Sequence, residues 1–496
     1  MNMIGYEFLK DQLGLQVFPI QRPAQVRSVT KIQELGDILA IPAAIAPRSS
    51  DPLEHLLFAL KHEGTELSLI AACMPHIPGE RMLQALTQTP NGIYTRKAAY
   101  FWEWFRGESL IGAPIAGGVI ADVFDPRQYL VGDVTDKSTR WRVNFNGLGS
   151  REFCPTVRKT KAIQQLMSEN IMGQVRSFMA SMDEAMLDRA LSWAYLDETK
   201  SSYAIEQEIP SGAKTETFMR LLKLAHDREP LTEAYLVQLQ NAAISNPMLR
   251  AMAFRHEQNF LRNSSPGVLG VTYLPPAPKD LMRVMNGVMA LNNPAHQATM
   301  EPLLRAGLVS FGFVFAHPFM DGNGRLSRFL IHQTLCRSQA LKDGQILPIS
   351  IAMKRHEKDY LNALKSFSRP ARGLWSATWI DGDSFEFEFK GHESVYRFWD
   401  ATPCIEFTYR MAKEALEKDL AQEVKFLEGY DRMVQTVNDN FDVVGSDLSM
   451  LILVCYQNNG RLSTNQRRKF KHRVSDEILD FIEKKAIEEF GNFSAQ

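Results

Sequence analysis

The chain has few cysteines, and their arrangement argues against two kinds of small scaffold. Five are spread over 496 residues, without a CxxC pair: Cys73, Cys154, Cys336, Cys404 and Cys455. An odd number without close pairs argues against a disulfide framework and against a cysteine-based zinc site. This usage is typical of a reducing compartment, so we expect a cytoplasmic protein.

Long apolar runs and an excess of charge are also missing. The longest nearly apolar stretch, residues 308–316, is about half of the roughly 20 residues that span a bilayer. The first residues already carry Glu7, Lys10 and Asp11, which differs from the apolar core of a signal peptide. Basic residues number 56 and acidic residues 57, so the formal net charge is −1. We therefore expect no membrane partner and no polyelectrolyte interaction of the whole chain.

The composition is that of an ordinary globular protein, arranged in three blocks. Hydrophobic residues make up 45% of the chain, and its length suits about three domains. We predict a mostly helical N-terminal domain of unknown role (1–155), a helical second domain (156–375) and a C-terminal domain (376–496). Within the second block, β-branched residues between Arg262 and Pro278 are flanked by Pro-Gly and Pro-Pro, which indicates a short hairpin.

The third block begins with a strand pattern and ends in helices, so we expect an α+β region. Phe385, Phe387 and Phe389 alternate with glutamates, and residues 411–437 have the spacing of a long amphipathic helix. From Arg461 to Arg473 there are six positive charges in thirteen residues, after helix–turn–helix-like punctuation. This run predicts either a solvated or protein-contacting face, or a winged-helix contact with nucleic acid. The acidic last helix offsets its charge and favours the first interpretation.

One segment, from His317 to Arg328, combines the residue types of a phosphate site. Helical spacing ends just before it and resumes near Arg325, which predicts a loop that leads into a helix N-terminus. Such a terminus exposes backbone N–H groups and a partial positive charge. Gly322 and Gly324 would let the backbone approach an anion closely.

The side chains of this segment add a base, a metal ligand and two cations. His317 is suited to act as a general base near neutral pH. Asp321 is a lone carboxylate amid positive charge, which makes sense if it holds Mg²⁺ on a phosphate. Arg325 and Arg328 are three residues apart and can flank one face of the helix, while Asn323 tolerates left-handed geometry. The chain has no GxxxxGK[ST] motif and no GxGxxG after a strand, so the two commonest phosphate loops are excluded.

The same segment resembles the signature of the Fic-domain family, HxFx(D/E)GNGRxxR, at every fixed position. The resemblance covers about residues 160–375 and implies an all-α Fic core with a short β-hairpin flap. Fic domains typically transfer the AMP of ATP to a Ser, Thr or Tyr hydroxyl of a protein and release pyrophosphate. The intact Gly322-Asn-Gly324 favours nucleotidyl transfer over the kinase-like relatives, which depart from it.

The resemblance implies a role for each residue of the motif. His317 would deprotonate the target hydroxyl, and Asp321 would bind Mg²⁺ (or Mn²⁺) between the α- and β-phosphates. Arg325 would hold the β-phosphate and Arg328 the γ-phosphate, with the α- and β-phosphates cradled by Gly322, Asn323 and Gly324. An extended segment of the target protein would pair with the flap residues Gly267, Val268, Leu269, Gly270, Val271, Thr272, Tyr273 and Leu274.

A second segment resembles the inhibitory helix of many Fic proteins, (S/T)xxxE(G/N). It reads Ser202-Tyr-Ala-Ile-Glu206-Gln207, so only Gln207 departs from the pattern. This predicts an inhibitory helix near residues 200–208, in which Glu206 pairs with Arg328 and excludes the productive γ-phosphate position. The alternative is a solvated acidic helix end, since Glu208 lies close by.

These features predict a self-inhibited protein adenylyltransferase that uses ATP with Mg²⁺ or Mn²⁺. One alternative is the removal of AMP, or transfer of another phosphate-linked group, by the same site. Another is a nucleotide-sensing regulatory protein with a C-terminal DNA-binding module. The sequence does not name the target protein. Relatives commonly dimerise, so a homodimer stays open.

Overall fold

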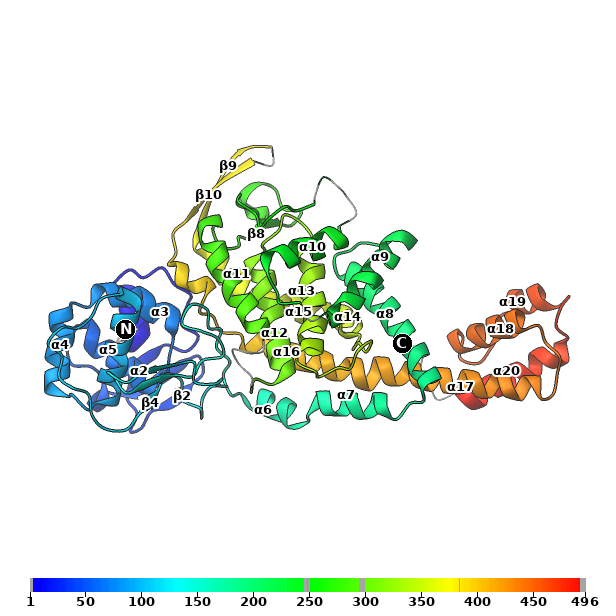
Figure 1. Ribbon diagram of the computed structural model, residues 1–496, viewed down its shortest axis with the longest axis horizontal. Helices are drawn as coiled ribbons and strands as arrows, with labels where there is room; N and C mark the ends of the chain where they lie inside the picture. Colours follow the sequence, from blue (N-terminus) through cyan, green and yellow to red (C-terminus); the bar gives the residue numbers. More distant parts are fainter. Residues whose placement is uncertain are drawn as a thin grey trace.

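The computed structural model describes residues 3–227, 229–244, 248, 250–293, 299–382 and 384–490. The chain is mainly helical, as predicted, and its strands form only sheets of two or three. Figure 1 shows an elongated molecule with the N-terminal part at one end, a helical body in the middle and a small helical lobe at the other end. In the part of the chain that the structure describes, no helix is long and apolar enough to cross a membrane.

The N-terminal part packs helices around two small sheets. The strands β1 (Ala24–Arg27), β3 (Ile38–Pro42) and β2 (Gln33–Leu35) form one sheet in that order, and β4 (Ala121–Asp122), β6 (Val143–Phe145) and β5 (Asp136–Ser138) form the other. In each sheet one pair is parallel and the other antiparallel. The helices are α1 (Gly5–Gln12), α2 (Pro52–His62), α3 (Leu67–Cys73), α4 (Gly79–Gln88) and α5 (Ile93–Arg106).

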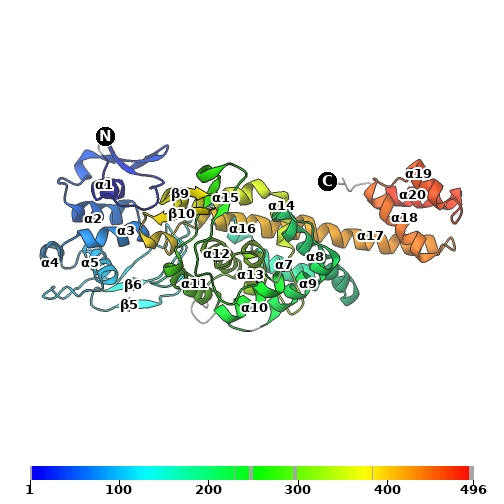
Figure 2. The same ribbon diagram turned by 90° about the horizontal axis from the view of Figure 1, so that it is seen from above.

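The central body is a bundle built around one apolar helix. α12 (Pro302–Ala316) is buried on nearly all sides, as expected for a helix that is apolar all round. It contacts α11 (Pro278–Asn292), α13 (Asn323–Arg337) and α16 (Thr402–Glu414), and Figure 2 places it in the middle of the body. The other helices are α6 (Lys161–Ser168), α7 (Ile171–Ala180), α8 (Glu184–Ile205), α9 (Gly212–Lys223), α10 (Glu233–Ala243), α14 (Ile349–Arg355) and α15 (Glu357–Gly373).

Two hairpins lie side by side on this body. The hairpin predicted before Pro278 is confirmed as β7 (Leu261–Arg262) paired antiparallel with β8 (Val271–Tyr273), joined through the 3-10 turn Gly267–Gly270. The strand predicted at Phe385 is confirmed as β10 (Ser384–Phe389), which pairs antiparallel with β9 (Trp375–Asp381). The Phe260 ring lies 5.4 Å from that of Phe385 and 5.1 Å from that of Phe387, so the second hairpin is packed onto the first.

The core runs across both predicted domain boundaries. One hydrophobic cluster extends from Tyr6 in the N-terminal part to Leu427 in α17 (Ala421–Asn438). The chain near residue 155 also bonds to the segment after β10, where Thr156 N donates to Trp399 O at 2.9 Å. The boundaries at 155 and 376 therefore coincide with changes of composition but with no break in packing.

The C-terminal lobe is carried on a long helix and has its own small core. α16 continues through a π-helical segment, Ala415–Leu420, into α17. The lobe adds α18 (Gly445–Gln457), α19 (Thr464–Phe470) and α20 (Asp476–Phe490) around a second hydrophobic cluster. Between residues 390 and 490 the structure describes no strand, so the winged-helix alternative is corrected to a helical lobe. The reason is that the residues after α19 repeat at helical spacing and form α20 where a wing would need alternating strands.

Candidate functional site

The motif residues form a loop between α12 and α13. His317 ends α12 in the left-handed conformation, with φ +48°, and Gly322 at φ +83° is the N-cap of α13. α13 begins at Asn323, slightly before the predicted start near Arg325. The loop therefore leads directly into a helix N-terminus, where backbone N–H groups lack partners within the helix.

Three buried side chains brace this loop. Asn323 bonds twice to Phe319, accepting from its N–H at 3.0 Å and donating to its carbonyl at 2.7 Å. Arg255 Nε donates to His317 O at 2.9 Å, and Asn259 Nδ2 donates to Phe319 O at 2.8 Å. Sequence reasoning missed Arg255 and Asn259, because neither belongs to a motif and both lie far from the loop in sequence.

His317 has the form that a general base requires. Its Nδ1 lies 3.1 Å from Val314 O, and because a carbonyl only accepts, Nδ1 carries the proton and Nε2 keeps its lone pair. Burial lowers the pKa of His317 to about 4, the Arg255 charge adds to this, and the Val314 bond and Asp321 oppose it. The imidazole is therefore neutral at physiological pH.

Asp321 is the one motif carboxylate and lies at the mouth of the loop. Its Oδ1 accepts from Gly322 N at 2.6 Å and lies 3.6 Å from Arg325 Nη2, while its side chain is 41% exposed. No group of three or more His, Cys, Asp or Glu side chains that could hold a metal occurs among the described residues. A single exposed carboxylate fits Mg²⁺ that takes its remaining ligands from phosphates and water.

Glu206 lies across the N-terminus of α13 and touches both arginines. Its Oε2 is 2.9 Å from Arg325 Nε, and its Oε1 accepts from Arg328 Nη2 at 2.9 Å. Both guanidinium groups are nearly buried, while the Glu206 side chain is 25% exposed. We call this pair of contacts the Glu206 bridge. It places an internal carboxylate where the loop and the helix terminus favour an anion.

The rest of the (S/T)xxxE segment also contacts Arg328. Ser202 receives two hydrogen bonds from it, Nε to Oγ and Nη2 to the carbonyl O, both at 2.8 Å. The Arg325 guanidinium additionally lies 5.0 Å from the centre of the Tyr203 ring. The acidic end of α8 is therefore docked on α13, in contrast to the alternative of a solvated end.

The end of α8 explains why the family pattern has Gly or Asn after the glutamate. Gln207 N donates to Ala204 O at 3.0 Å and Glu208 N to Tyr203 O at 3.1 Å, the bonding pattern of a Schellman cap. In that cap the residue at position 207 takes the left-handed conformation, and Gln207 has φ +61°. Gly and Asn adopt this conformation most easily, so Gln207 holds the end of α8 under strain.

The flap lies next to the loop but is only partly accessible. Val271, Tyr273 and Leu274 are buried, and the Tyr273 hydroxyl donates to Phe315 O at the end of α12. Leu269 is 83% exposed and Thr272 is exposed. Of the expected docking residues, the structure therefore exposes only Leu269 and Thr272 well, while Gly267 and Val268 are partly exposed and Gly270 is buried.

The basic run of the C-terminal lobe is partly neutralised within the lobe. Arg467 contacts both Asp480, at 2.6 Å, and Glu483 on α20. Arg473 pairs with Asp447 at 2.7 Å and stacks over Phe470. A contact with nucleic acid through this run stays a prediction.

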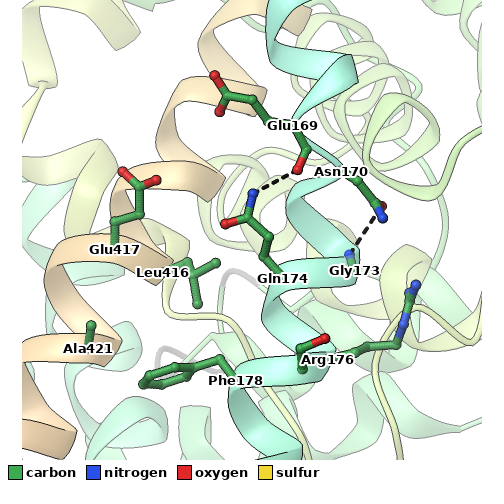
Figure 3. Close-up of a pocket in the computed structure, with 10 residues that line it drawn as sticks. Glu169, Asn170, Gly173, Gln174, Arg176, Phe178, Leu416, Glu417 and Ala421 are labelled. Carbon is green, nitrogen blue, oxygen red and sulfur yellow. Dashed lines mark hydrogen bonds between the residues drawn. The ribbon is translucent and has the colours of Figure 1, made fainter.

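A groove on another face of the body contains no motif residue. It lies between α7 and the π-helical segment, has a volume of about 750 Å³, and includes Gln174 and Leu416 in its lining. Figure 3 shows that the Gln174 side chain of α7 points back to the residues before this helix, where it donates to the Glu169 carbonyl at 2.7 Å. Glu169 in turn pairs with Lys413 at 2.7 Å. The groove therefore contributes no group to the site at the loop.

Comparisons with known proteins fall on the region of the loop. Residues 230–335 match the model of the Fic/DOC family. The protein adenylyltransferase Fic of Drosophila sechellia is 34% identical over 93 residues, which are 19% of this chain and 18% of that protein. The protein of the same name from Drosophila virilis is 26% identical over 244 residues, which are 45% of this chain and 48% of that protein. The aligned regions thus cover less than half of either relative.

A solved Fic family protein from Desulfovibrio desulfuricans G20 aligns with 17% identity and a TM-score of 0.39, over 68% of this chain and 92% of that one. The family match, by contrast, spans α10 to α13 and includes the whole motif loop. The chain therefore contains a Fic domain, which the family model matches over residues 230–335.

Proposed function

We propose that this protein is an adenylyltransferase that transfers the AMP of ATP to a Ser, Thr or Tyr hydroxyl of a target protein, and that Glu206 inhibits it. The observation that carries the proposal is the Glu206 bridge, because in it an internal carboxylate pairs with the two arginines that would otherwise bind the phosphates of ATP. The names of the relatives, protein adenylyltransferase Fic, support the reaction.

The chemistry follows from the base and the cations. The neutral His317, with Nε2 free of a proton, would accept the proton of the target hydroxyl as its oxygen bonds to the α-phosphorus. The bond from the α-phosphorus to the oxygen that bridges to the β-phosphate then breaks, and pyrophosphate leaves. Arg325, Arg328 and the N-terminus of α13 would balance the charge on the phosphates, which is the main contribution of a protein to such transfers.

A divalent cation would be held at one side of this site. Asp321 would ligate Mg²⁺ or Mn²⁺ through its exposed carboxylate, together with the phosphates of ATP. When bound, the cation would supply charge neutralisation at the bridging phosphates. Transfer should therefore stop when EDTA is added.

Inhibition follows from competition between like charges. While the Glu206 bridge is intact, the γ-phosphate of ATP cannot pair with Arg328, and the carboxylate repels the triphosphate. The nucleotide would then bind, if at all, in a position that does not align the α-phosphorus with the target hydroxyl. Removal of the Glu206 side chain should release both arginines.

The test is AMP transfer from labelled ATP, measured with Mg²⁺ and with Mn²⁺ on the chain itself and on added proteins. We expect a gain in Glu206→Gly over the wild type, and its loss in Glu206→Gly with His317→Ala. Glu208→Gln is the matched control, because Glu208 lies 4.0 Å from Arg325 but does not touch Arg328. If Glu206→Gly transfers no AMP with either metal, the proposed transferase activity is refuted. If the wild type and Glu206→Gly transfer AMP equally, the proposed inhibition by Glu206 is refuted.

A further inference from the structure

The contact between α8 and α13 continues beyond the Glu206 bridge. On α8, Glu198, Ser202 and Glu206 are spaced four residues apart and share one face; on α13, Arg328 and His332 do the same. Glu206 and Ser202 meet Arg328, and one turn further Glu198 meets His332. The two helices are therefore joined by a row of polar contacts, of which the last lies outside both family motifs.

This last contact is fully buried and ties three helices together. The Glu198 Oε1 lies 2.8 Å from His332 Nε2, and its Oε2 accepts from Ser350 N, in α14, at 2.8 Å. The Ser350 hydroxyl also donates to Oε1. Glu198, His332 and Ser350 are each at most 1% exposed. Since a carboxylate only accepts, His332 Nε2 must be the donor in the first of these bonds.

Burial of the Glu198 carboxylate costs desolvation free energy, so we expect this contact to serve a purpose other than stability. Apolar side chains of similar volume would pack at least as well, and such replacements are often neutral or stabilising. What directional bonds add is register: a helix held by them cannot slide or rotate, whereas an apolar contact tolerates both. The Glu206 bridge needs this register, because Glu206 is the C-cap of α8 and lies at an end that would otherwise fray.

We propose that Glu198, His332 and Ser350 form an anchor that fixes the register of α8 on α13 and thereby sets how strongly Glu206 inhibits the site. The expected effect of the anchor on AMP transfer rests on the proposed function, whereas its expected effect on the position of α8 is independent of that function. Glu198 is in this view a positioning residue, which acts through Glu206 and touches no substrate.

The test removes the directional bonds but keeps the packing. The double variant Glu198→Leu with His332→Phe is measured with Glu206 intact and in the Glu206→Gly background. The conservative Glu198→Gln is the matched control, because its amide can bond to the other tautomer of His332 and to the Ser350 hydroxyl. If the double variant fails to fold, Ser350→Ala, which loses one bond to Glu198, takes its place. The two readouts are AMP transfer from labelled ATP and amide hydrogen exchange at residues 198–206.

The expected result depends on the background. With Glu206 intact, the double variant should raise transfer about fivefold to tenfold, as loss of buried hydrogen bonds implies, and should speed exchange at residues 198–206. In the Glu206→Gly background it should leave transfer unchanged, and Glu198→Gln should stay close to the wild type.

A merely structural role would lower transfer equally in both backgrounds, and that outcome would overturn the anchor. Unchanged exchange at residues 198–206 would do the same. If Glu206→Gly itself shows no transfer, the proposed function is refuted, and the exchange measurement alone decides whether the anchor holds α8.

Discussion

Glu206 and Gly324 touch so closely that no other residue at position 324 would leave Glu206 in place. A β-carbon on residue 324 would come to 2.4 Å from Glu206 Oε1. Gly324 is in the first turn of α13, so the same space lies in front of the helix N-terminus. In our proposal that space takes one anion at a time, either the carboxylate of Glu206 or a phosphate of ATP.

Gly324→Ala should therefore displace Glu206 without activating the protein. The flexible end of the Glu206 side chain can move away from the new methyl group, but a phosphate would meet the same obstacle. We expect transfer from labelled ATP to stay at or below that of the wild type, and the double variant with Glu206→Gly to lose most of the gain of Glu206→Gly alone. Activation of Gly324→Ala to the level of Glu206→Gly would contradict this account.

Gln207→Gly should strengthen inhibition. A left-handed residue with a side chain costs roughly 1 kcal/mol more than glycine, so relieving the strain should stabilise the docked end of α8 by about that amount. Residual transfer by the wild type should fall by about fivefold as a result. Gln207→Ala is the control, because alanine keeps the β-carbon and the strain and should leave transfer unchanged. Higher transfer in Gln207→Gly would show that the strain does not oppose docking.

The candidate site was predictable where residues close in sequence determine it. The loop, the helix N-terminus and the pairing of Glu206 with Arg328 follow from short motifs, and the structure brings all these residues together. Arg255 and Glu198 were not predictable, because each acts on residues more than 50 positions away and neither stands in a recognisable pattern. Burial of a charged side chain depends on the whole fold, which spacing along one helix does not reveal.

The fold, too, was predictable where residues close in sequence determine it and not where distant residues do. The helices of the central body, the first hairpin and the strand β10 followed from periodicity and from Gly and Pro, which act within a few residues. The short strands β1 to β6 of the N-terminal part, predicted only as mostly helical, did not. The packing of the second hairpin on the first did not either, because it depends on contacts of Phe260 with Phe385 and Phe387, which lie far away in sequence. The winged-helix alternative failed for the converse reason: local punctuation suggested it, whereas the spacing of Asp476–Phe490 already indicated a helix.

The pH dependence of transfer should reflect the environment of His317. Its pKa is lowered to about 4, mainly by burial, so the base is deprotonated from about pH 5 upward. In the Glu206→Gly variant under limiting ATP, the titration of His317 should leave the rate of transfer level between pH 6 and 8. Below this range the rate should fall, with a midpoint near pH 4. The measurement is the initial rate across pH, limited to the range in which circular dichroism shows the chain folded. A midpoint near 6.5 would show that His317 titrates as an exposed imidazole.

Stability should depend on pH through Glu63 in the N-terminal part. Its Oε1 accepts from Tyr6 N at 3.0 Å, while its buried Oε2 has no hydrogen-bond partner among the residues described. Burial raises the pKa of Glu63 to about 8; the backbone amides of Tyr6 and Ala24 oppose the rise, and the charges of Glu66 and Glu7 add to it. The folded state thus keeps a proton that the unfolded state releases near pH 4.5, so its stabilisation is present below pH 4.5 and is lost as the pH rises through 8.

Glu63→Gln removes that titration and imitates the protonated form. We expect the variant to match the wild type near pH 4.5 and to exceed it by up to about 5 kcal/mol at pH 8.5, because roughly 3.5 pH units at about 1.4 kcal/mol each separate the pKa values of the unfolded and folded states. The measurement is the difference between their urea unfolding transitions. Glu80→Gln, at an exposed position of α4, is the control and should change stability equally at both pH values. If the wild type and Glu63→Gln respond to pH in the same way, Glu63 is ionised in the folded protein and its unpaired oxygen has a partner that its burial does not suggest.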